Sequence, residues 1–485
     1  MSIKLSQIKG FLNSFLLHKG TFDLLQIDLI KRLVKHRAFQ FAVILPNLFF
    51  FWLIILTGFF GSPVGNMNLS ITFVWMLWWF ALIALLVPLF SRLWCTICPI
   101  PSFGEWMQRK GFIRKKEDYK PLGFNKSWPV RFRNIWLQNL GFLILATFSV
   151  LLVTRPIVTG IILAILIILA SVLAIFYAKR VFCRYICPVG GFLGLFSMFS
   201  SIELRVKKKE LCVHHFSKEC IKGCETSYGC PWFEYPGSME RNNFCGLCFE
   251  CVKACPFNNI ALNLRSFGKD ILAKVGRSLD EAWKAFIMLT LAILYILVMQ
   301  GPWGWIRDLA NVFYSPSYGF ALNGIEGFLL YAGLFWGTSL GLTPVTFLGF
   351  SYLSKAFSKA SLPLRRLFID FSYELIPLAL GAWIAFSIPI IMVNWSYIVN
   401  TLSDPFGWGW NLFGTKEIPW TPITPEFIPY LQVLIVTIGL FYSIKLGFKL
   451  SSQHFLEKNL ALRAFIPQLA FLIGTSILLA WLFVG

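Results

Sequence analysis

Four cysteines lie within eleven residues near the middle of this chain. They form the run Cys245-Gly-Leu-Cys248-Phe-Glu-Cys251-Val-Lys-Ala-Cys255-Pro, with the spacing C-x2-C-x2-C-x3-C-P. Thiolate sulfur is the ligand that iron–sulfur clusters require, and this spacing gives three thiolates to one [4Fe–4S] cluster and the fourth to a second. Structural zinc and buried free cysteines are the alternatives, but zinc sites use paired C-x2-C arms across a long spacer. The run therefore predicts iron–sulfur chemistry.

A second, stretched run of four cysteines lies just upstream, before Pro231. When two such runs occur together, the fourth cysteine of each crosses to the cluster of the other. This rule predicts two ligand sets: Cys230, Cys245, Cys248 and Cys251 for one cluster, and Cys212, Cys220, Cys224 and Cys255 for the other. His214 and His215 offer an alternative ligand beside Cys212. Because four cysteines already suffice, we interpret both histidines as loop residues that face solvent.

The remaining four of the twelve cysteines belong to an internal repeat. Its copies are Arg92-Leu-Trp-Cys95-Thr-Ile-Cys98-Pro99 and Arg180-Val-Phe-Cys183-Arg-Tyr-Ile-Cys187-Pro188, the first one residue shorter. Each copy ends a pair of apolar segments, so we expect two parallel two-helix units with both motifs at one membrane face. The four thiols are enough for a third iron–sulfur cluster. A redox-active dithiol pair and two structural cysteine pairs are the alternatives.

The composition places these motifs in a membrane protein. The 485 residues are 57% hydrophobic and only 14% charged, whereas soluble domains are about one quarter charged. Nine segments are long and apolar enough to span a bilayer: 41–60, 69–91, 134–153, 157–178, 283–300, 322–347, 371–398, 428–447 and 464–484. We therefore predict an all-α polytopic membrane protein of about nine transmembrane helices, with a small cytoplasmic insert that binds two clusters.

The distribution of charge predicts the orientation. The 92–133 loop holds ten Lys or Arg against three acidic residues, whereas the loops on the opposite side hold three basic residues in all. The positive-inside rule then places the N-terminus, this loop and the insert in the cytoplasm, and the C-terminus outside the cytoplasmic (inner) membrane. The membrane also accounts for the net charge of +21. The sequence carries no nucleic-acid-binding motif, so we expect no nucleic-acid partner.

Four regions follow from these patterns: residues 1–36, 37–200, 201–265 and 266–485. The first is amphipathic and basic, with apolar faces such as Leu25, Leu29 and Leu33, and predicts helices on the cytoplasmic membrane surface. The second is the four-helix unit with the two cysteine motifs. The third is the insert, and the fourth is a five-helix membrane unit.

The last region carries few groups capable of chemistry. It contains no cysteine and no intramembrane histidine, so bis-histidine haem is excluded and we expect no haem. Glu326 falls inside the sixth span, where a carboxylate is energetically costly. It could therefore serve quinone or proton chemistry as a catalytic group. The equal alternative is an interfacial residue in contact with water. Asp370 and Glu374 begin the seventh span, and we interpret Asp370 as a surface partner of nearby arginines.

Over residues 40–262 the chain resembles the polyferredoxin-type membrane proteins of the NapH, NosR and CcoG (FixG) types. Four spans, two cysteine-pair-proline motifs and a two-cluster ferredoxin insert carry the resemblance. The family motif is C-x3-C-P, which Cys183, Cys187 and Pro188 match, whereas Cys95 and Cys98 are one residue too close. The resemblance implies electron transfer between membrane quinone and a partner redox protein.

Two functional hypotheses follow. The first is a redox subunit of a quinol-linked oxidoreductase complex, which passes electrons between the quinone pool and a partner protein through [4Fe–4S] clusters on the cytoplasmic face. Its partners would be membrane lipid, quinone and other redox subunits. The second is an assembly or maturation factor that reduces a metal or thiol for a partner metalloenzyme.

Overall fold

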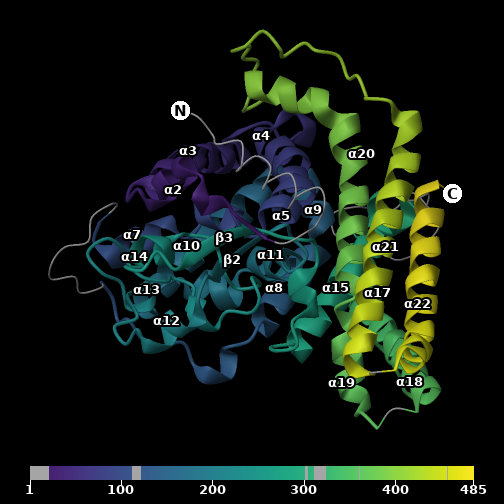
Figure 1. Ribbon diagram of the computed structural model, residues 1–485. Helices are drawn as coiled ribbons and strands as arrows, with labels where there is room; N and C mark the ends of the chain where they lie inside the picture. Colours follow the sequence, from purple (N-terminus) through teal and green to yellow (C-terminus); the bar gives the residue numbers. More distant parts are fainter. Residues whose placement is uncertain are drawn as a thin grey trace. The chain divides into compact units, whose positions relative to one another are not determined.

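The computed structural model describes residues 21–111, 122–300, 304–310, 324–359, 361–455 and 457–484, and it is mostly helical (Figure 1). The chain divides into two compact units. The first contains residues 1–53, 85–138 and 163–275, and the second contains residues 54–84, 139–162 and 276–485. All twelve cysteines belong to the first unit.

Eight helices of the described residues are long and apolar enough to cross a membrane. They are α3 (Phe39–Phe60), the helix Leu69–Phe90, α10 (Pro156–Phe176), Leu279–Gln300 (α15 and η9), Ile325–Ser358 (α17, η10 and α18), Leu364–Ser403 (α19 and α20), Pro425–His454 (η11 and α21) and α22 (Lys458–Val484). These helices confirm the predicted membrane class.

The ninth expected span, 134–153, is not one helix. It consists of α8 (Trp136–Thr147) and α9 (Ser149–Thr154), which are separated by Phe148 at φ −91° and ψ 14°. A ψ near zero interrupts the α-helical hydrogen bonds, so neither piece reaches the length of a span by itself. Arg155 is extended before Pro156, as expected for a residue that precedes proline, and α10 begins at once.

The insert is built on a small antiparallel sheet. Strand β3 (Ile260–Leu264) pairs with β2 (Ile202–Val206) on one side and with β1 (Phe22–Asp23) on the other. In the β2–β3 register Ile202 lies opposite Leu264, and Val206 lies opposite Ile260. The two long strands therefore bring the ends of the cysteine-bearing segment together. Short helices α12 (Lys209–His214), α13 (Glu219–Lys222) and α14 (Glu250–Ala254) fill that segment.

Part of the leading region packs on the insert, although we expected it on the membrane surface. Phe22, Leu25 and Val34 lie in the same hydrophobic core as Leu204 and Leu262, while Leu29 and Leu33 are 54% and 51% exposed. The predicted apolar helix face is not continuous, because η1 (Leu24–Gln26) ends at an extended Ile27 before α2 (Asp28–Lys35) begins. Residues 1–20 lie outside the described residues.

A buried ionic network fixes the base of the sheet. The guanidinium of Arg265 is fully buried and lies 3.2 Å from the carboxylate of Glu203, and it also pairs with Asp270. Arg205 lies 2.6 Å from Asp270, whose other oxygen accepts from the Asn242 amide at 2.6 Å. The network holds the segment that precedes Cys245 against β2 and β3.

The second unit is a helical bundle. In Figure 1, α20 (Leu375–Ser403), α21 (Ile428–His454) and α22 run side by side, and α15 (Leu279–Tyr295) packs against α20. Gly381 and Gly439 allow a close approach of α20 and α21, because a Cβ at Gly381 would lie 3.1 Å from the Ile435 carbonyl oxygen. Trp383 is fully buried, and its indole N–H donates to the Met288 carbonyl at 2.8 Å.

Candidate iron–sulfur site

The first predicted ligand set lines a single cavity of the insert. Its walls contain four cysteines and six other residues: Cys230, Cys245, Cys248, Cys251, Leu204, Trp232, Glu234, Pro236, Met239 and Phe249. These four cysteines are the set that the crossing rule selects. Mostly apolar walls with four thiols around one cavity suit a [4Fe–4S] cluster, in which each thiolate binds a different iron atom. The assignment of these thiols as iron ligands stays a prediction.

Backbone amides point toward the sulfur atoms of this loop. The N–H of Leu247 hydrogen-bonds to Cys245, and the N–H of Glu250 hydrogen-bonds to Cys248. Leu247 and Phe249 have φ values of +52° and +61°, a costly left-handed conformation that lets the chain wrap around the cavity. Burial nevertheless raises the pKa of the Cys245 thiol to about 12, and Cys230 adds to the rise. Iron would offset that cost, since a coordinated thiol is deprotonated.

The same donor pattern recurs in other cysteines of the chain. Cys98 receives a hydrogen bond from the Ile100 amide and Cys230 from the Trp232 amide, two residues on in each case. The Gly190 amide lies 3.4 Å from the sulfur of Cys187. Hydrogen bonds to sulfur favour the thiolate and tune the potential of a bound cluster, so these thiols share the surroundings of cluster ligands.

The fold brings together some members of the second predicted ligand set, which comprises Cys212, Cys220, Cys224 and Cys255. Asn259 bridges two of its members, because its backbone N–H donates to the sulfur of Cys255 at 3.3 Å and its side chain donates to Cys212 at 3.4 Å. Burial raises the pKa of Cys220 to about 11, with further contributions from Cys212 and Cys255. Cys224 has a different neighbour, the Thr226 hydroxyl at 3.1 Å.

The neighbouring histidines have surroundings of their own. His214 is exposed. The Nε2 atom of His215 lies 2.7 Å from the Ser217 hydroxyl, and its ring packs edge-on against Phe257. His215 follows the end of α12, as the loop interpretation expects, whereas His214 is exposed but is the last residue of that helix, so it is not a loop residue.

The two repeat motifs meet in the first unit. Negative charge on Cys187 and Cys95 contributes to a raised pKa of the Cys98 thiol, and Cys187, Cys98 and Cys95 contribute in the same way at Cys183. Cys95 and Cys183 are buried. Burial raises the pKa of Cys187 to about 11, and Cys95 adds to the rise. The repeat thus supplies four neighbouring thiols in low-dielectric surroundings.

The structure also explains the missing residue of the first motif. Cys95 lies in α6 (Trp94–Ile97), a single α-helical turn, whereas Cys183 lies in η6 (Phe182–Ile186), a π-helical turn. The Cys187 amide donates to the Phe182 carbonyl at 2.8 Å, five residues back. A π-turn accommodates one extra residue, so C-x2-C in an α-turn and C-x3-C in a π-turn are equivalent.

Two buried arginines begin the repeats and were not singled out from the sequence. Arg92 is 1% exposed and its Nη2 lies 3.7 Å from the sulfur of Cys95. Arg180 is 3% exposed, donates to the Cys95 carbonyl at 2.9 Å and pairs with Glu105. Their identical position in both repeat copies was the signal that could have found them.

Trp232 connects the repeat motifs with the insert cavity. Both guanidinium groups lie over its indole, Arg92 at 4.6 Å and Arg180 at 5.9 Å from the ring centroid. The same indole lines the cavity of the first cysteine set. A Cβ at Gly246 would lie 2.2 Å from the indole, so this position requires glycine. The Thr96 hydroxyl donates to the Gly246 carbonyl at 2.6 Å, which joins the two motifs directly.

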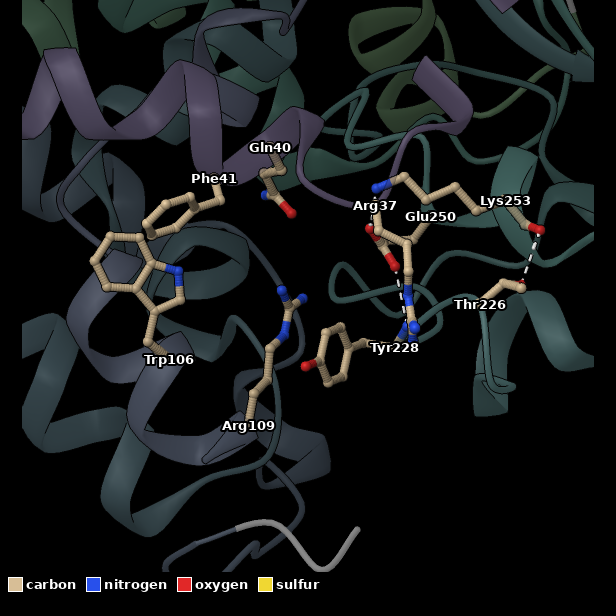
Figure 2. Close-up of a pocket in the computed structure, with 9 residues that line it drawn as sticks. All are labelled: Arg37, Gln40, Phe41, Trp106, Arg109, Thr226, Tyr228, Glu250 and Lys253. Carbon is tan, nitrogen blue, oxygen red and sulfur yellow. Dashed lines mark hydrogen bonds and ion pairs between the residues drawn. The ribbon is translucent and has the colours of Figure 1, made fainter. Parts of the chain in front are cut away.

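A polar pocket lies where the first membrane helix begins. Figure 2 shows its nine lining residues: Arg37, Gln40, Phe41, Trp106, Arg109, Thr226, Tyr228, Glu250 and Lys253. The guanidinium of Arg109 lies 4.3 Å from the centroid of the Tyr228 ring, and Lys253 pairs with Glu250 at 2.8 Å.

The pocket is rich in donors. Gln40 is 6% exposed, and its amide nitrogen has no hydrogen-bond partner within the part of the chain that the structure describes. In Figure 2 its side chain extends toward the guanidinium of Arg109. Phe41 and Trp106, 5.5 Å apart between ring centroids, form an aromatic wall.

Glu326 has a less distinctive position. It lies in the first turn of α17 (Ile325–Gly337), and its side chain is exposed. It belongs to the second unit, whereas all the cysteines belong to the first. Its proposed catalytic role stays a prediction.

No three His, Cys, Asp or Glu side chains of the described residues converge on one point where a single metal ion would bind. In a [4Fe–4S] cluster each thiolate binds a different iron atom, so the sulfur atoms are spread over the corners of the cluster.

A comparison with protein families finds that one family model matches this chain at two places. A "4Fe-4S binding domain" matches residues 71–120 and 159–209. Each match contains an apolar span followed by one cysteine motif, so the model matches the two repeat copies.

Two curated relatives come from Methanocaldococcus jannaschii. "Uncharacterized protein MJ0749" is 31% identical over 113 residues, which are 23% of this chain and 42% of the relative. "Uncharacterized protein MJ0750" is 26% identical over 97 residues, which are 20% of this chain and 36% of the relative. The chain thus spans less than half the length of each. No solved structure matches.

The 4Fe–4S binding domains and the eight apolar helices together support a multi-pass membrane protein of the iron–sulfur electron-transfer class.

Proposed function

We propose that this protein passes electrons between the quinone pool and a partner redox protein through three [4Fe–4S] clusters. The contact that carries the proposal is Trp232, which lies against both Arg92 and Arg180 of the repeat and also lines the insert cavity. Bound clusters would supply one-electron redox chemistry. The polyferredoxin-type resemblance agrees with this function.

The three cysteine sets follow one another through the first unit. Thr96 of the first repeat motif is hydrogen-bonded to Gly246, between Cys245 and Cys248 of the first insert set. Cys220 of the second set adds to the raised pKa of the Cys251 thiol, after burial and the cysteines of its own set. A continuous sequence of sites is what stepwise electron transfer requires.

The pocket of Figure 2 is our candidate for the quinone headgroup. Quinone carbonyls accept hydrogen bonds, and Gln40, Arg109 and Tyr228 carry donors. The aromatic wall suits a flat ring. The pocket adjoins the start of α3, where an isoprenoid tail would enter lipid, and Glu250 is next to Cys251 in sequence.

We place the clusters on the cytoplasmic face of the inner membrane. The support is the excess of Lys and Arg in the 92–133 loop and the suitability of a reducing compartment for free thiols. A cytoplasmic electron donor or acceptor then fits most directly.

The test is iron and acid-labile sulfide per chain in anaerobically purified protein, with electron paramagnetic resonance after dithionite reduction. We expect about twelve of each in the wild type and about eight in a Cys95→Ser, Cys183→Ser double variant. Ser197→Ala, in the helix that follows the second motif, is the matched control. About eight in the wild type would limit the clusters to the insert, and zinc in place of iron would end the proposal.

Quinone coupling is tested separately with a reduced menaquinone analogue. We expect it to reduce the clusters of the wild type, and a Gln40→Leu, Arg109→Gln variant with full iron content to be reduced more slowly. Equal rates in both would move the quinone site elsewhere.

A further inference from the structure

The second unit buries a carboxyl group that the electron-transfer proposal does not use. Glu374 lies at the junction of α19 (Leu364–Ser372) and α20, and it is fully buried. Neither carboxyl oxygen has a hydrogen-bond partner among the residues that the structure describes. A buried, unpaired carboxylate is very costly, so the group is expected to hold a proton instead.

Room for this carboxyl is provided by a glycine. A Cβ at Gly447 of α21 would lie 2.4 Å from Oε2 of Glu374 and 2.5 Å from the ring of Phe465 on α22. Glycine and phenylalanine side chains offer no oxygen ligands to a metal cation, whereas a proton needs only the carboxyl itself. The surroundings therefore favour a proton as the occupant.

A path toward solvent begins one helical turn away. Asp370 lies four residues before Glu374, on the same helical side. His454, at the end of α21, places Nε2 2.9 Å from its carboxylate. Arg277 lies 3.3 Å and Arg366 3.6 Å from the same group, and the Arg366 side chain is 64% exposed. The cluster around Asp370 thus reaches the surface.

Further ionisable groups lie on α15, which packs against α20, and on α21, where Lys445 and Lys449 stand two residues on either side of Gly447 and are exposed. The hydroxyl of Tyr373 donates to Glu281 and accepts from the Ser278 amide at 3.1 Å. Lys284 is fully buried, with its ammonium 4.2 Å from the centroid of the Phe142 ring. Glu281 has a donor in Tyr373, which distinguishes it from Glu374.

Polar side chains, most of them from neighbouring helices, form hydrogen bonds along α20 toward its other end. The Leu378 amide donates to the Ser443 hydroxyl at 3.1 Å. Gln432 donates to the Ala385 carbonyl at 3.0 Å, and Gln300 donates to the Phe386 carbonyl at 2.6 Å. The hydroxyls of Thr401 and Thr72 lie 2.7 Å apart. Polar side chains of the bundle thus reach the backbone of α20 at several levels.

We propose that Glu374 is a proton-exchange site of the second unit, loaded from solvent through His454 and Asp370. A proton from solvent binds the His454–Asp370 pair and passes to the Glu374 carboxylate, and the reverse steps release it. Only O–H and N–H bonds form and break, and no electron moves. The transfer between Asp370 and Glu374 would require a water molecule that bridges the helical turn between them.

The test is infrared spectroscopy of the full chain in lipid nanodiscs near neutral pH. A protonated buried carboxyl gives a C=O stretching band that shifts on exchange into D2O. We expect Glu374→Gln to lose one such band, while Glu417→Gln, which changes an exposed loop carboxylate, keeps it. Identical spectra for wild type and Glu374→Gln would overturn the proposal.

The route is tested by the rate of that D2O shift. We expect His454→Gln and Asp370→Asn to slow it about a hundredfold, within the range that a positioned proton donor contributes. Unchanged rates in both would overturn the route.

A crowding variant covers the case in which Glu374→Gln does not fold. Gly447→Ala should move the band, because its new methyl group would contact Oε2; an unmoved band in folded Gly447→Ala would contradict this site. Folding of every variant is checked by its iron content and its melting temperature.

Discussion

At the scale of single residues, the position of a positive charge beside a sulfur atom should decide the potential of the membrane-edge centre. Arg92 is buried with its guanidinium 3.7 Å from the Cys95 sulfur. Because reduction adds negative charge to a cluster, a nearby cation favours the reduced form. Arg92→Gln should therefore lower the midpoint potential of this centre by roughly 60 mV, a tenfold change for one electron. Redox titration followed by electron paramagnetic resonance measures the shift.

Arg184 supplies the matched control for this substitution. It belongs to the second repeat copy, but its guanidinium pairs with Glu234 at 2.9 Å. Arg184→Gln should shift the potential less than Arg92→Gln does. Equal shifts in the two variants would mean that the charge acts at long range, and that the contact with Cys95 is unimportant.

Acid stability at the residue scale should depend on Glu105. Burial alone would raise the pKa of its carboxyl, but Arg109 and Arg180 outweigh burial and hold it below its ordinary value of 4.5. A lowered pKa in the folded state adds stability above the unfolded value, and this stability is lost as pH falls below 4.5. Glu105→Gln should cost about 3 kcal/mol at neutral pH, since it leaves buried arginines without their partner.

Melting temperature in detergent between neutral pH and pH 4 measures this effect. Glu240→Gln, which removes an exposed pair with Lys209, should cost less than about 1 kcal/mol. A Glu105→Gln variant that melts like the wild type at neutral pH would contradict the ionic role.

At the scale of elements, the difference between an α-turn and a π-turn should determine which motif tolerates an extra residue. In α6 the short motif is fixed by the bond from Thr96 to Gly246. Inserting alanine after Thr96 would create the family spacing C-x3-C, yet it should displace Cys98 because this turn has no room for the residue. We expect the iron content to fall by about four atoms. An alanine inserted after Gly414, in an exposed loop, should leave it unchanged.

The elements also show what the sequence could predict. The cysteine spacing predicted which four thiols line the insert cavity, because crossing ligands follow from the run itself. It did not predict the π-turn, since the hydrogen bond from Cys187 to Phe182 depends on packing. The apolar face of Leu25, Leu29 and Leu33 suggested a lipid contact, but the same apolarity lets Leu25 pack on the insert. Hydrophobicity identifies a buried side chain without identifying its partner.

The residues of the candidate site likewise include some that the sequence could predict and some that it could not. Cysteines were identified because their type and spacing imply a ligand. Arg92, Arg180 and Trp232 were missed because single arginines and tryptophans are common at membrane edges, and only tertiary contacts bring them onto the sulfur sites. The lack of a hydrogen-bond partner for Glu374 among the described residues likewise follows from the packing of the bundle, although its position in a span was visible in the sequence.

At the scale of the whole molecule, the number of crossings decides where the C-terminus lies. Within the described ranges, eight helices meet the length of a span, and an even number would leave both termini on one side. The cysteine motifs argue for a ninth crossing. Cys98 follows the helix Leu69–Phe90 and Cys187 follows α10, and the two thiols interact. If α10 crosses the membrane to bring Cys187 to the face that holds Cys98, the chain must first cross in the opposite direction.

The pair α8 and α9 is the segment available for that crossing. Its 12 and 6 helical residues together with Phe148 extend over at most about 28 Å at 1.5 Å per residue, close to the thickness of a bilayer core. We therefore expect nine crossings and a C-terminus on the side opposite to the cysteines. Alkaline phosphatase fused after residue 484 should be active, and a fluorescent protein fused at the same point should not fluoresce. For fusions in the 122–133 loop we expect the opposite result. A fluorescent C-terminal fusion would mean that α8 and α9 form a re-entrant hairpin with α10, and that Cys187 reaches Cys98 without a crossing.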